Sequence, residues 1–325
     1  MTRINILKTL LLLVLICASS AYAQPEKQYP TRPVTLVSPY PPGGGNDAVS
    51  RAIAQRLSIS LGQTVLVENR AGANGLIAAE HVARAAPDGY TLLMGNNGTH
   101  GVNPSLYKKL PYDPLGDFAP VSQVGTAPNV LVVNPSLGVH SVGELVAYLK
   151  KHPGKATYGS TGMGSSQHMA GALFGNAFGV DMVHVPYKGS APVLTDLLGG
   201  RIDMSFINII AARPYIESGQ LTALAVTSAT RSQLMPDLPT IGETAKGYAV
   251  TVWIGIMAPR QTPKAIVDLL STRIRTALEQ PEMKAQLSAI GADPKGSSPD
   301  EFEAFIKAEL KHGAEAVRIS GATAE

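Results

Sequence analysis

The chain contains the same local design twice. Residues 35–53 predict a strand, a turn with the sequence Pro-Gly-Gly-Gly and a helix. Residues 156–173 predict a strand, the turn Gly-Ser-Thr-Gly-Met-Gly and a second helix. Each half therefore offers a Gly-rich loop that leads into a helix N-terminus. The repetition favours two similar lobes that face one another across a cleft.

Short apolar runs rich in β-branched residues alternate with amphipathic helices along the rest of the chain. This alternation is typical of α/β layers built on largely parallel sheets. We predict strands at 34–37, 65–67, 91–94, 157–158, 182–185, 202–206 and 221–226. We predict helices at 48–61 and 75–85, and a helix with a capping box at Ser141 and Glu144 that ends near residue 151. Thr262-Pro263 and Ser298-Pro299 each predict an N-cap followed by an N1 proline.

The N-terminus has the three parts of a secretory signal peptide. Arg3 and Lys8 are basic, residues 10–18 are apolar, and Ala21-Tyr22-Ala23 is an A-x-A cleavage site. The apolar run is shorter than the roughly 20 residues that a membrane-spanning helix needs. We therefore expect cleavage after Ala23 and export of the mature chain to the periplasm.

The charge and cysteine content exclude several classes of function. Cys17 lies in the segment to be removed and follows the bulky Ile16, so we expect neither a lipid anchor nor, in the mature chain, a disulfide or thiolate site. Without Arg3 and Lys8 the chain keeps 25 basic and 24 acidic side chains. This balance does not resemble the basic stripe of a nucleic-acid-binding protein.

The two Gly-rich loops predict anion binding. A Gly-rich turn before a helix exposes backbone N–H groups beside the positive end of the helix dipole. The first loop lacks the Gly-Lys-Ser/Thr of a phosphate-binding loop and the G-x-G-x-x-G spacing of a dinucleotide site. Helix–strand packing alone explains one such turn equally well, but two turns, one in each half, favour a binding cleft.

Neither loop contains Lys or Arg, so a carboxylate would be held by amide N–H groups, hydroxyl groups and water. Several candidates have a competing structural interpretation. Asp47 either braces the turn or binds the ligand. Asn96 either lines the crevice or is a turn residue. Lys188 either contacts the ligand or is exposed only to solvent. His168 is a structural histidine or a ligand contact, and Ser165 and Ser166 cap a helix whether or not they bind.

Catalytic signatures are missing from the sequence. There is no G-x-S-x-G motif, and none of the seven histidines lies in a recognisable zinc or triad context. We predict a protein that is not an enzyme and has no cofactor and no metal. The alternative is a secreted hydrolase that uses Ser160 or Ser165, for which His168 is the local candidate base.

Five blocks of sequence are similar to one known family. Residues 37–47 and 158–168, together with 185–189, 224–228 and 253–259, resemble blocks of the Bug-type receptors of tripartite tricarboxylate transporters. The resemblance covers the mature chain. It implies a Venus-flytrap of two α/β lobes joined by two crossing strands. It also implies a carboxylate held through both Gly-rich loops and delivered to an inner-membrane permease.

One position departs from the family pattern. The family often has Asp-Asn where this chain has Ile207-Asn208, so the identity of a relative's ligand does not transfer directly. Tricarboxylates, dicarboxylates, acidic amino acids and aromatic carboxylates all fit such a cleft. A monomeric receptor for uptake is the main prediction, and a sensory partner that presents its ligand to a kinase is a further alternative.

We expect lobe 1 to comprise residues 24–126 and 229–325 and lobe 2 residues 127–228, with crossings near 126–132 and 224–228. The predicted ligand-binding residues are Tyr40, Gly43, Gly44, Gly45, Asn46, Asp47, Asn96, Ser160, Thr161, Gly162, Gly164, Ser165, Ser166, His168, Tyr187, Lys188 and Asn208.

Overall fold

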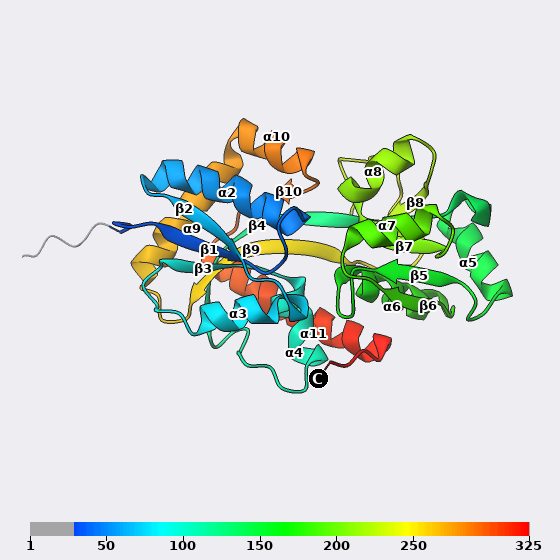
Figure 1. The fold of residues 1–325 in the computed structure, drawn as a ribbon, viewed down its shortest axis with the longest axis horizontal. Helices are drawn as coiled ribbons and strands as arrows, with labels where there is room; N and C mark the ends of the chain where they lie inside the picture. Colours follow the sequence, from blue (N-terminus) through cyan, green and yellow to red (C-terminus); the bar gives the residue numbers. More distant parts are fainter. Residues whose placement is uncertain (1–28, 325) are drawn as a thin grey trace, which may run out of the picture.

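The computed structural model describes residues 29–324, so the predicted signal peptide and its cleavage site after Ala23 lie outside the described residues. The described chain forms two α/β lobes that share a ten-stranded sheet (Figure 1). The main path of this sheet has the order β2-β1-β3-β9-β4-β7-β5-β6, and β10 and β8 both pair with β4. The predicted two-lobed α/β class is confirmed.

The first lobe is built on a sheet in which β1 is parallel to both β2 and β3. Its strands are β1 (Val34–Ser38), β2 (Val65–Asn69), β3 (Thr91–Asn96), β9 (Thr251–Pro259), β10 (Asp293–Pro294) and the first part of β4 (Phe118–Val133). Its helices are α2 (Gly45–Leu61), η1 (Ala73–Gly75), α3 (Leu76–Ala83), η2 (Gly98–Val102), α4 (Asn103–Leu106), α9 (Lys264–Glu279), α10 (Pro281–Ala289) and α11 (Pro299–Ser320).

The second lobe has the end of β4 at its centre, paired with β7 and β8. Its other strands are β5 (Thr157–Ser160), β6 (Val183–Pro186), β7 (Met204–Asn208) and β8 (Thr222–Val226). Its helices are η3 (Pro135–Leu137), α5 (Val142–Lys151), α6 (Ser166–Phe178), α7 (Ser190–Leu198), α8 (Ile209–Glu217) and η4 (Ile241–Glu243).

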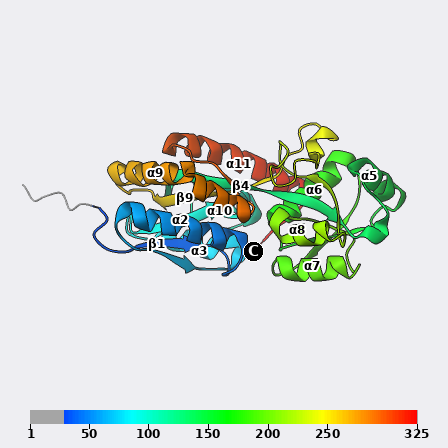
Figure 2. The same cartoon turned by 90° about the horizontal axis from the view of Figure 1, so that it is seen from above.

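In each lobe, apolar side chains on the two faces of the sheet form separate cores. This is the pattern expected when helices cover both faces. In the first lobe α2, α9 and α10 cover one face, and α3 and α11 cover the other (Figures 1 and 2). In the second lobe α5 and α6 cover one face, and α7 and α8 cover the other. The Gly-rich loops therefore lead into α2 and α6, one in each lobe.

Two strands connect the lobes. Residues Phe118–Pro128 of β4 pair with β9, and the next residues, Asn129–Val133, pair with β7. Strand β9 enters the first lobe at Thr251, directly after Val250 exchanges hydrogen bonds with Thr227. Figure 1 shows both strands running between the two groups of helices.

The segment between β8 and β9 lies with the second lobe. Ile241 and Tyr248 are buried in the same cluster as Tyr158 and Phe174, and the Tyr248 hydroxyl donates to the Ala170 carbonyl at 2.9 Å. The predicted boundary at residue 229 stays a prediction. These contacts favour a later second crossing, between Val250 and Thr251.

Helix starts follow the capping signals with two corrections. Ser298 caps α11 and forms the complete box with Glu301. Ser141 also caps α5, but the Glu144 carboxylate accepts from the N–H of His140 rather than closing the box on Ser141. Pro263 is the N-cap of α9 rather than its first helical residue, because its ψ of 135° is extended.

Candidate ligand-binding site

The first Gly-rich loop ends at an uncapped helix N-terminus. Helix α2 begins at Gly45, three residues earlier than predicted, and Gly44 is its N-cap. No side chain within residues 29–324 caps this terminus. Gly43, Gly44 and Gly45 are all exposed, and Gly43 has φ +86°, a conformation that L side chains rarely adopt. The loop therefore leaves backbone N–H groups accessible at the positive end of α2.

Asp47 braces this loop. Its carboxylate accepts from the Gly43 N–H at 2.9 Å, from Arg51 Nε at 3.0 Å and from Asn69 Nδ2 at 2.8 Å. Burial raises the pKa of the Asp47 carboxyl, but these three hydrogen bonds outweigh it and hold the pKa below its usual range. The structure favours the bracing role over direct ligand contact, because the Asp47 side chain is buried and accepts three hydrogen bonds from the protein.

Asn46 and Tyr40 flank the same loop. Asn46 Oδ1 accepts from the Ser38 hydroxyl at 3.0 Å, and its Nδ2 is buried without a hydrogen-bond partner among the described residues. Burial is the main cause that raises the pKa of Tyr40 to about 12, so its hydroxyl is protonated and can donate. Asn96 is buried at the end of β3 and accepts from the Thr99 N–H, which is a turn role.

The second Gly-rich loop leads into a capped helix. Ser165 is the N-cap of α6 and accepts from the His168 N–H at 3.3 Å, while Ser166 is the first helical residue. The Thr161 hydroxyl donates to Gln167 Oε1 at 2.7 Å. Gly162 has φ +127° and Gly164 has φ +75°. Both conformations explain why glycine occupies these two positions.

A buried histidine, His168, and a half-buried one, His184, support the second loop. His168 Nδ1 accepts from the Gly164 N–H at 3.2 Å, and His184 Nε2 lies 2.6 Å from the Ser160 hydroxyl. Burial lowers the pKa of each ring to about 4, and for His184 the neighbouring His168 adds to the effect. Ser160 Oγ also accepts from the Gly162 N–H at 3.1 Å. This hydrogen bond gives His168 a structural role in the loop, and its predicted contact with a ligand stays a prediction.

The segment after β6 lies beside this loop. The Tyr187 N–H donates to the Ser160 carbonyl at 2.9 Å, and the Tyr187 hydroxyl donates to Asp196 Oδ2 at 2.8 Å. Burial is the first cause that raises the pKa of Tyr187 to about 12. Lys188 is exposed next to it.

Two asparagines face one another where the lobes join. Asn208 pairs with Asn129 of β4, and its side chain caps α8 by accepting from the Ile210 N–H at 3.0 Å. Asn129 is fully buried, donates from Nδ2 to the Ser166 hydroxyl at 3.1 Å, and leaves Oδ1 without a partner among residues 29–324.

A chain of hydrogen bonds connects the two loops through a residue that sequence reasoning missed. The Tyr40 hydroxyl donates to Asn74 Oδ1 at 3.2 Å, and Asn74 Nδ2 donates to the Gly164 carbonyl at 3.3 Å. Asn74 precedes Gly75, and an Asn-Gly pair is a turn signal that could have drawn attention to it. The structure thus brings together Tyr40 from the first loop and Gly164 from the second.

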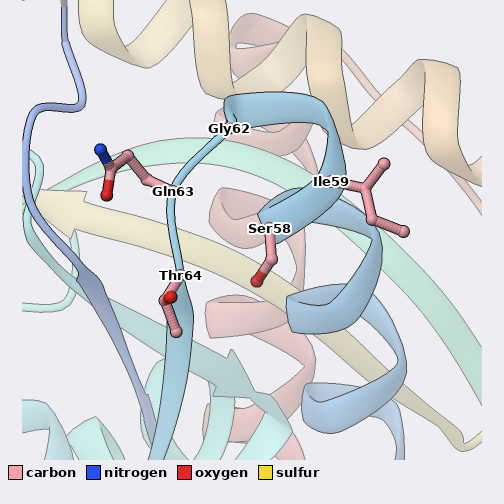
Figure 3. A pocket seen from close by; sticks show the side chains of 5 residues that line it. All are labelled: Ser58, Ile59, Gly62, Gln63 and Thr64. Carbon is pink, nitrogen blue, oxygen red and sulfur yellow. The ribbon is translucent and has the colours of Figure 1, made fainter.

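A separate hollow of about 350 Å³ lies at the opposite end of α2 (Figure 3). It is lined by Ser58, Ile59, Gly62, Gln63 and Thr64, without a charged side chain. It is remote from the Gly-rich loop because α2 separates the two.

Within the described part of the chain there is no group of three or more His, Cys, Asp or Glu able to hold a metal. No helix between residues 29 and 324 has the length and apolarity to cross a membrane.

Comparison with known proteins decides the family. The family described as tripartite tricarboxylate transporter family receptor matches residues 49–321. The chain belongs to this family. Protein BugT of Bordetella pertussis is 38% identical over 322 residues, which cover 98% of this chain and 99% of BugT. The predicted resemblance to Bug-type receptors is confirmed.

Solved structures agree with this assignment. A protein of R. palustris solved with adipate is 40% identical, has a TM-score of 0.84 and covers 91% of this receptor and 99% of its own chain. MatC from Rhodopseudomonas palustris, solved with bound malate, is 33% identical, has a TM-score of 0.78 and covers 89% of this receptor and 100% of MatC. The receptor therefore has the two-lobed periplasmic-binding-protein fold.

Proposed function

We propose that this receptor captures a small carboxylate between its lobes and delivers it to the inner-membrane permease of a tripartite tricarboxylate transporter. The observation that carries the proposal is the pair of Gly-rich loops at α2 and α6, tied together through Tyr40, Asn74 and Gly164. The adipate and malate bound to its relatives support the ligand class.

Recognition rests on neutral donors in this proposal. Backbone N–H groups at the starts of α2 and α6 donate to the carboxylate, and the positive ends of the two helix dipoles attract its negative charge. Arg51, which follows the first loop in α2, already forms an ion pair with Asp47 at 3.0 Å. Two anion sites on opposite lobes suit a ligand with a carboxylate at each end. Binding without a fixed cation also permits release to the permease.

The site residues divide into two groups under this proposal. We assign direct ligand contact to exposed or half-exposed groups of the loops, namely Gly44, Gly45, Asn46 and Ser166, with Lys188 at the rim. Gly43, Thr161 and Gly162 shape the loops instead, because their donors are bonded to Asp47, Gln167 and Ser160. We assign a supporting role to the groups whose hydrogen bonds stay within the protein, namely Tyr40, Asp47, Asn96, Ser160, Gly164, Ser165, His168, Tyr187 and Asn208.

The hydrolase alternative loses its support from the geometry of Ser160. This serine is fully buried and holds the turn of its own loop by accepting from Gly162 and contacting His184. Ser165 is occupied as the N-cap of α6, and His168 accepts from Gly164 instead of activating a serine. Because a nucleophile must reach its substrate, we propose a binding protein without catalytic activity.

The proposal also includes where the protein is exported and where its lobes meet. We propose cleavage after Ala23, a periplasmic location, and a monomer whose second crossing lies between Val250 and Thr251. The intact mass of the exported protein tests the cleavage. A mass that still includes residues 1–23 would contradict it.

The ligand is testable directly. The mature protein is purified from its native periplasm without denaturation, and the small molecules it releases on unfolding are identified by mass spectrometry. Calorimetry with adipate and malate, and with their dimethyl esters as uncharged controls, then measures affinity. We expect a free carboxylate to be released and at least one free acid to bind while its ester does not. Release of an uncharged molecule with no binding of acids would contradict the proposal, and hydrolysis of the esters would restore the enzyme alternative.

A further inference from the structure

Asn74 adopts a backbone conformation that asparagine tolerates better than most residues do. Its φ is +49° and that of Ala73 before it is +47°, and the flanking Gly72 and Gly75 also have positive φ. Left-handed residues other than glycine are uncommon and persist where the surroundings hold them. The turn thereby aims the Asn74 side chain at a set of fixed partners.

The side-chain amide of Asn74 has hydrogen-bond partners in three directions. Its Oδ1 accepts from the Tyr40 hydroxyl at 3.2 Å. Its Nδ2 donates to Asn103 Oδ1 at 3.0 Å and to the Gly164 carbonyl at 3.3 Å. Tyr40 and Asn103 belong to the first lobe, whereas Gly164 belongs to the second. One side chain therefore joins both lobes at the two Gly-rich loops.

The backbones approach closely at this junction. A Cβ added at Gly164 would lie 2.5 Å from Leu106 Cδ2 and 3.2 Å from Asn74 Nδ2. A Cβ at Gly98 would lie 2.9 Å from both Asn74 Oδ1 and the Tyr40 hydroxyl. Glycine at both positions makes room for the amide of Asn74. The second loop is therefore closely packed against the first lobe, and a larger residue at Gly164 or Gly98 would clash.

An apolar cluster continues the same contact between the lobes. Val102 and Leu106 of the first lobe, and Ala316 and Val317 of α11, are buried with Met169 of α6. Figure 2 shows α11 reaching across toward α6. All of these contacts are between protein groups and involve no ligand atom.

We propose that Asn74 is a positioning residue that docks the second Gly-rich loop on the first lobe and sets the fraction of ligand-free receptor that is closed. Only the consequence for affinity rests on the proposed function. When only the closed state is binding-competent, the apparent dissociation constant rises in proportion as that state is depopulated. Loss of one neutral hydrogen bond should lower the ratio of closed to open receptor about fivefold.

The test measures the distance between the lobes in ligand-free protein. Spin labels are placed on Ile59→Cys in α2 and Lys151→Cys in α5, both exposed positions, in the mature chain that has no other cysteine. Asn74→Gly keeps the backbone conformation but removes the amide, and Asn74→Asp keeps the shape but removes the donor. Asn134→Ala is the matched control, because its Nδ2 bonds to Leu197 within the second lobe.

We expect both Asn74 variants to shift the distance distribution of unliganded receptor toward longer distances, while Asn134→Ala matches the wild type. A wild-type distribution in Asn74→Gly would overturn the proposal, as would an equal shift in Asn134→Ala. A shift in the Asn74 variants of a receptor that binds no carboxylate would leave this proposal standing and refute the proposed function.

Discussion

The imidazole rings of His168 and His184 stack in the second lobe with their centroids 4.0 Å apart and an angle of 14° between their planes. Each ring holds a different part of the Gly-rich loop, His168 through the Gly164 N–H and His184 through the Ser160 hydroxyl. His168 can accept at Nδ1 only while that nitrogen is unprotonated. The conformation of the loop is thereby coupled to the protonation state of the pair.

This pair should make the receptor less stable in mild acid. Burial lowers the pKa of both rings from 6.5 to about 4. Between these values the unfolded chain binds more protons than the folded one, so the free energy of unfolding falls as pH falls from 6.5 toward 4. The buried His168 alone contributes at most roughly 3 kcal/mol. Urea unfolding at intervals across this pH range measures the slope.

Replacement of the ring should flatten that slope. In His168→Gln the stability should depend less on pH between 6.5 and 4, although its absolute value is lower because packing changes. His140→Gln is the control, because His140 is exposed and only its backbone N–H is bonded. An unchanged slope in His168→Gln would show that other groups dominate the acid sensitivity.

Gly44 and Gly162 should respond differently to alanine. Gly44 has φ −84° and its nearest neighbour to an added Cβ, the Pro41 carbonyl, is 3.8 Å away, so Gly44→Ala should bind nearly as well as wild type. Gly162 has φ +127°, so Gly162→Ala distorts the turn and should weaken carboxylate binding at least fivefold, the fold-change equivalent to about 1 kcal/mol. Gly44→Leu should weaken binding by obstruction. A lower carboxylate affinity in Gly44→Ala than in Gly162→Ala, measured by calorimetry, would contradict the loop geometry.

Gly164→Ala should weaken binding through the contact between the lobes. The added Cβ meets Leu106 at 2.5 Å, and the residue has φ +75°. Gly179→Ala separates the two effects, because Gly179 has φ +61° with no atom within 4 Å of an added Cβ. We expect both variants to lose stability to backbone strain, Gly164→Ala to lose more because of the clash with Leu106, and only Gly164→Ala to lose affinity. Equal affinities would show that the contact does not affect binding.

Lys188→Met should have a small effect. Lys188 is exposed beside the second loop, where water and salt screen its charge. We expect less than a tenfold loss of affinity, with a smaller dependence on salt concentration than in the wild type. Loss of all binding in this variant would mean that a fixed cation dominates recognition.

The sequence predicted the elements that have a local signal. The Gly-rich turns, the N-cap at Ser298 and the alternation of strands and helices all depend on nearby residues, and the structure confirms them. Helix α2 starts earlier than predicted because glycines at its N-terminus obscure the periodic pattern. Pro263 is the N-cap of α9 because its ψ is extended, whereas its φ of −53° would also suit a first helical residue.

The contacts between the lobes could not be predicted from local patterns. Asn74 and Gly164 are 90 positions apart, and His184 contacts Ser160 only because β5 and β6 are paired. Asn129 has a weaker signal, as a polar residue within the apolar run of β4, but its partner Ser166 is far along the chain. Such pairs emerge from topology, for which one sequence carries no direct signal.

The most direct test of recognition by two helix N-termini is a titration of isotope-labelled receptor with adipate or malate, whichever binds, followed through its backbone amide resonances. We predict changes at both Gly-rich loops, in residues 43–46 and 161–167, and none around Ser58 and Thr64, which line the remote hollow. Saturable binding with changes at only one loop, or with neither loop affected, would contradict recognition by two helix N-termini.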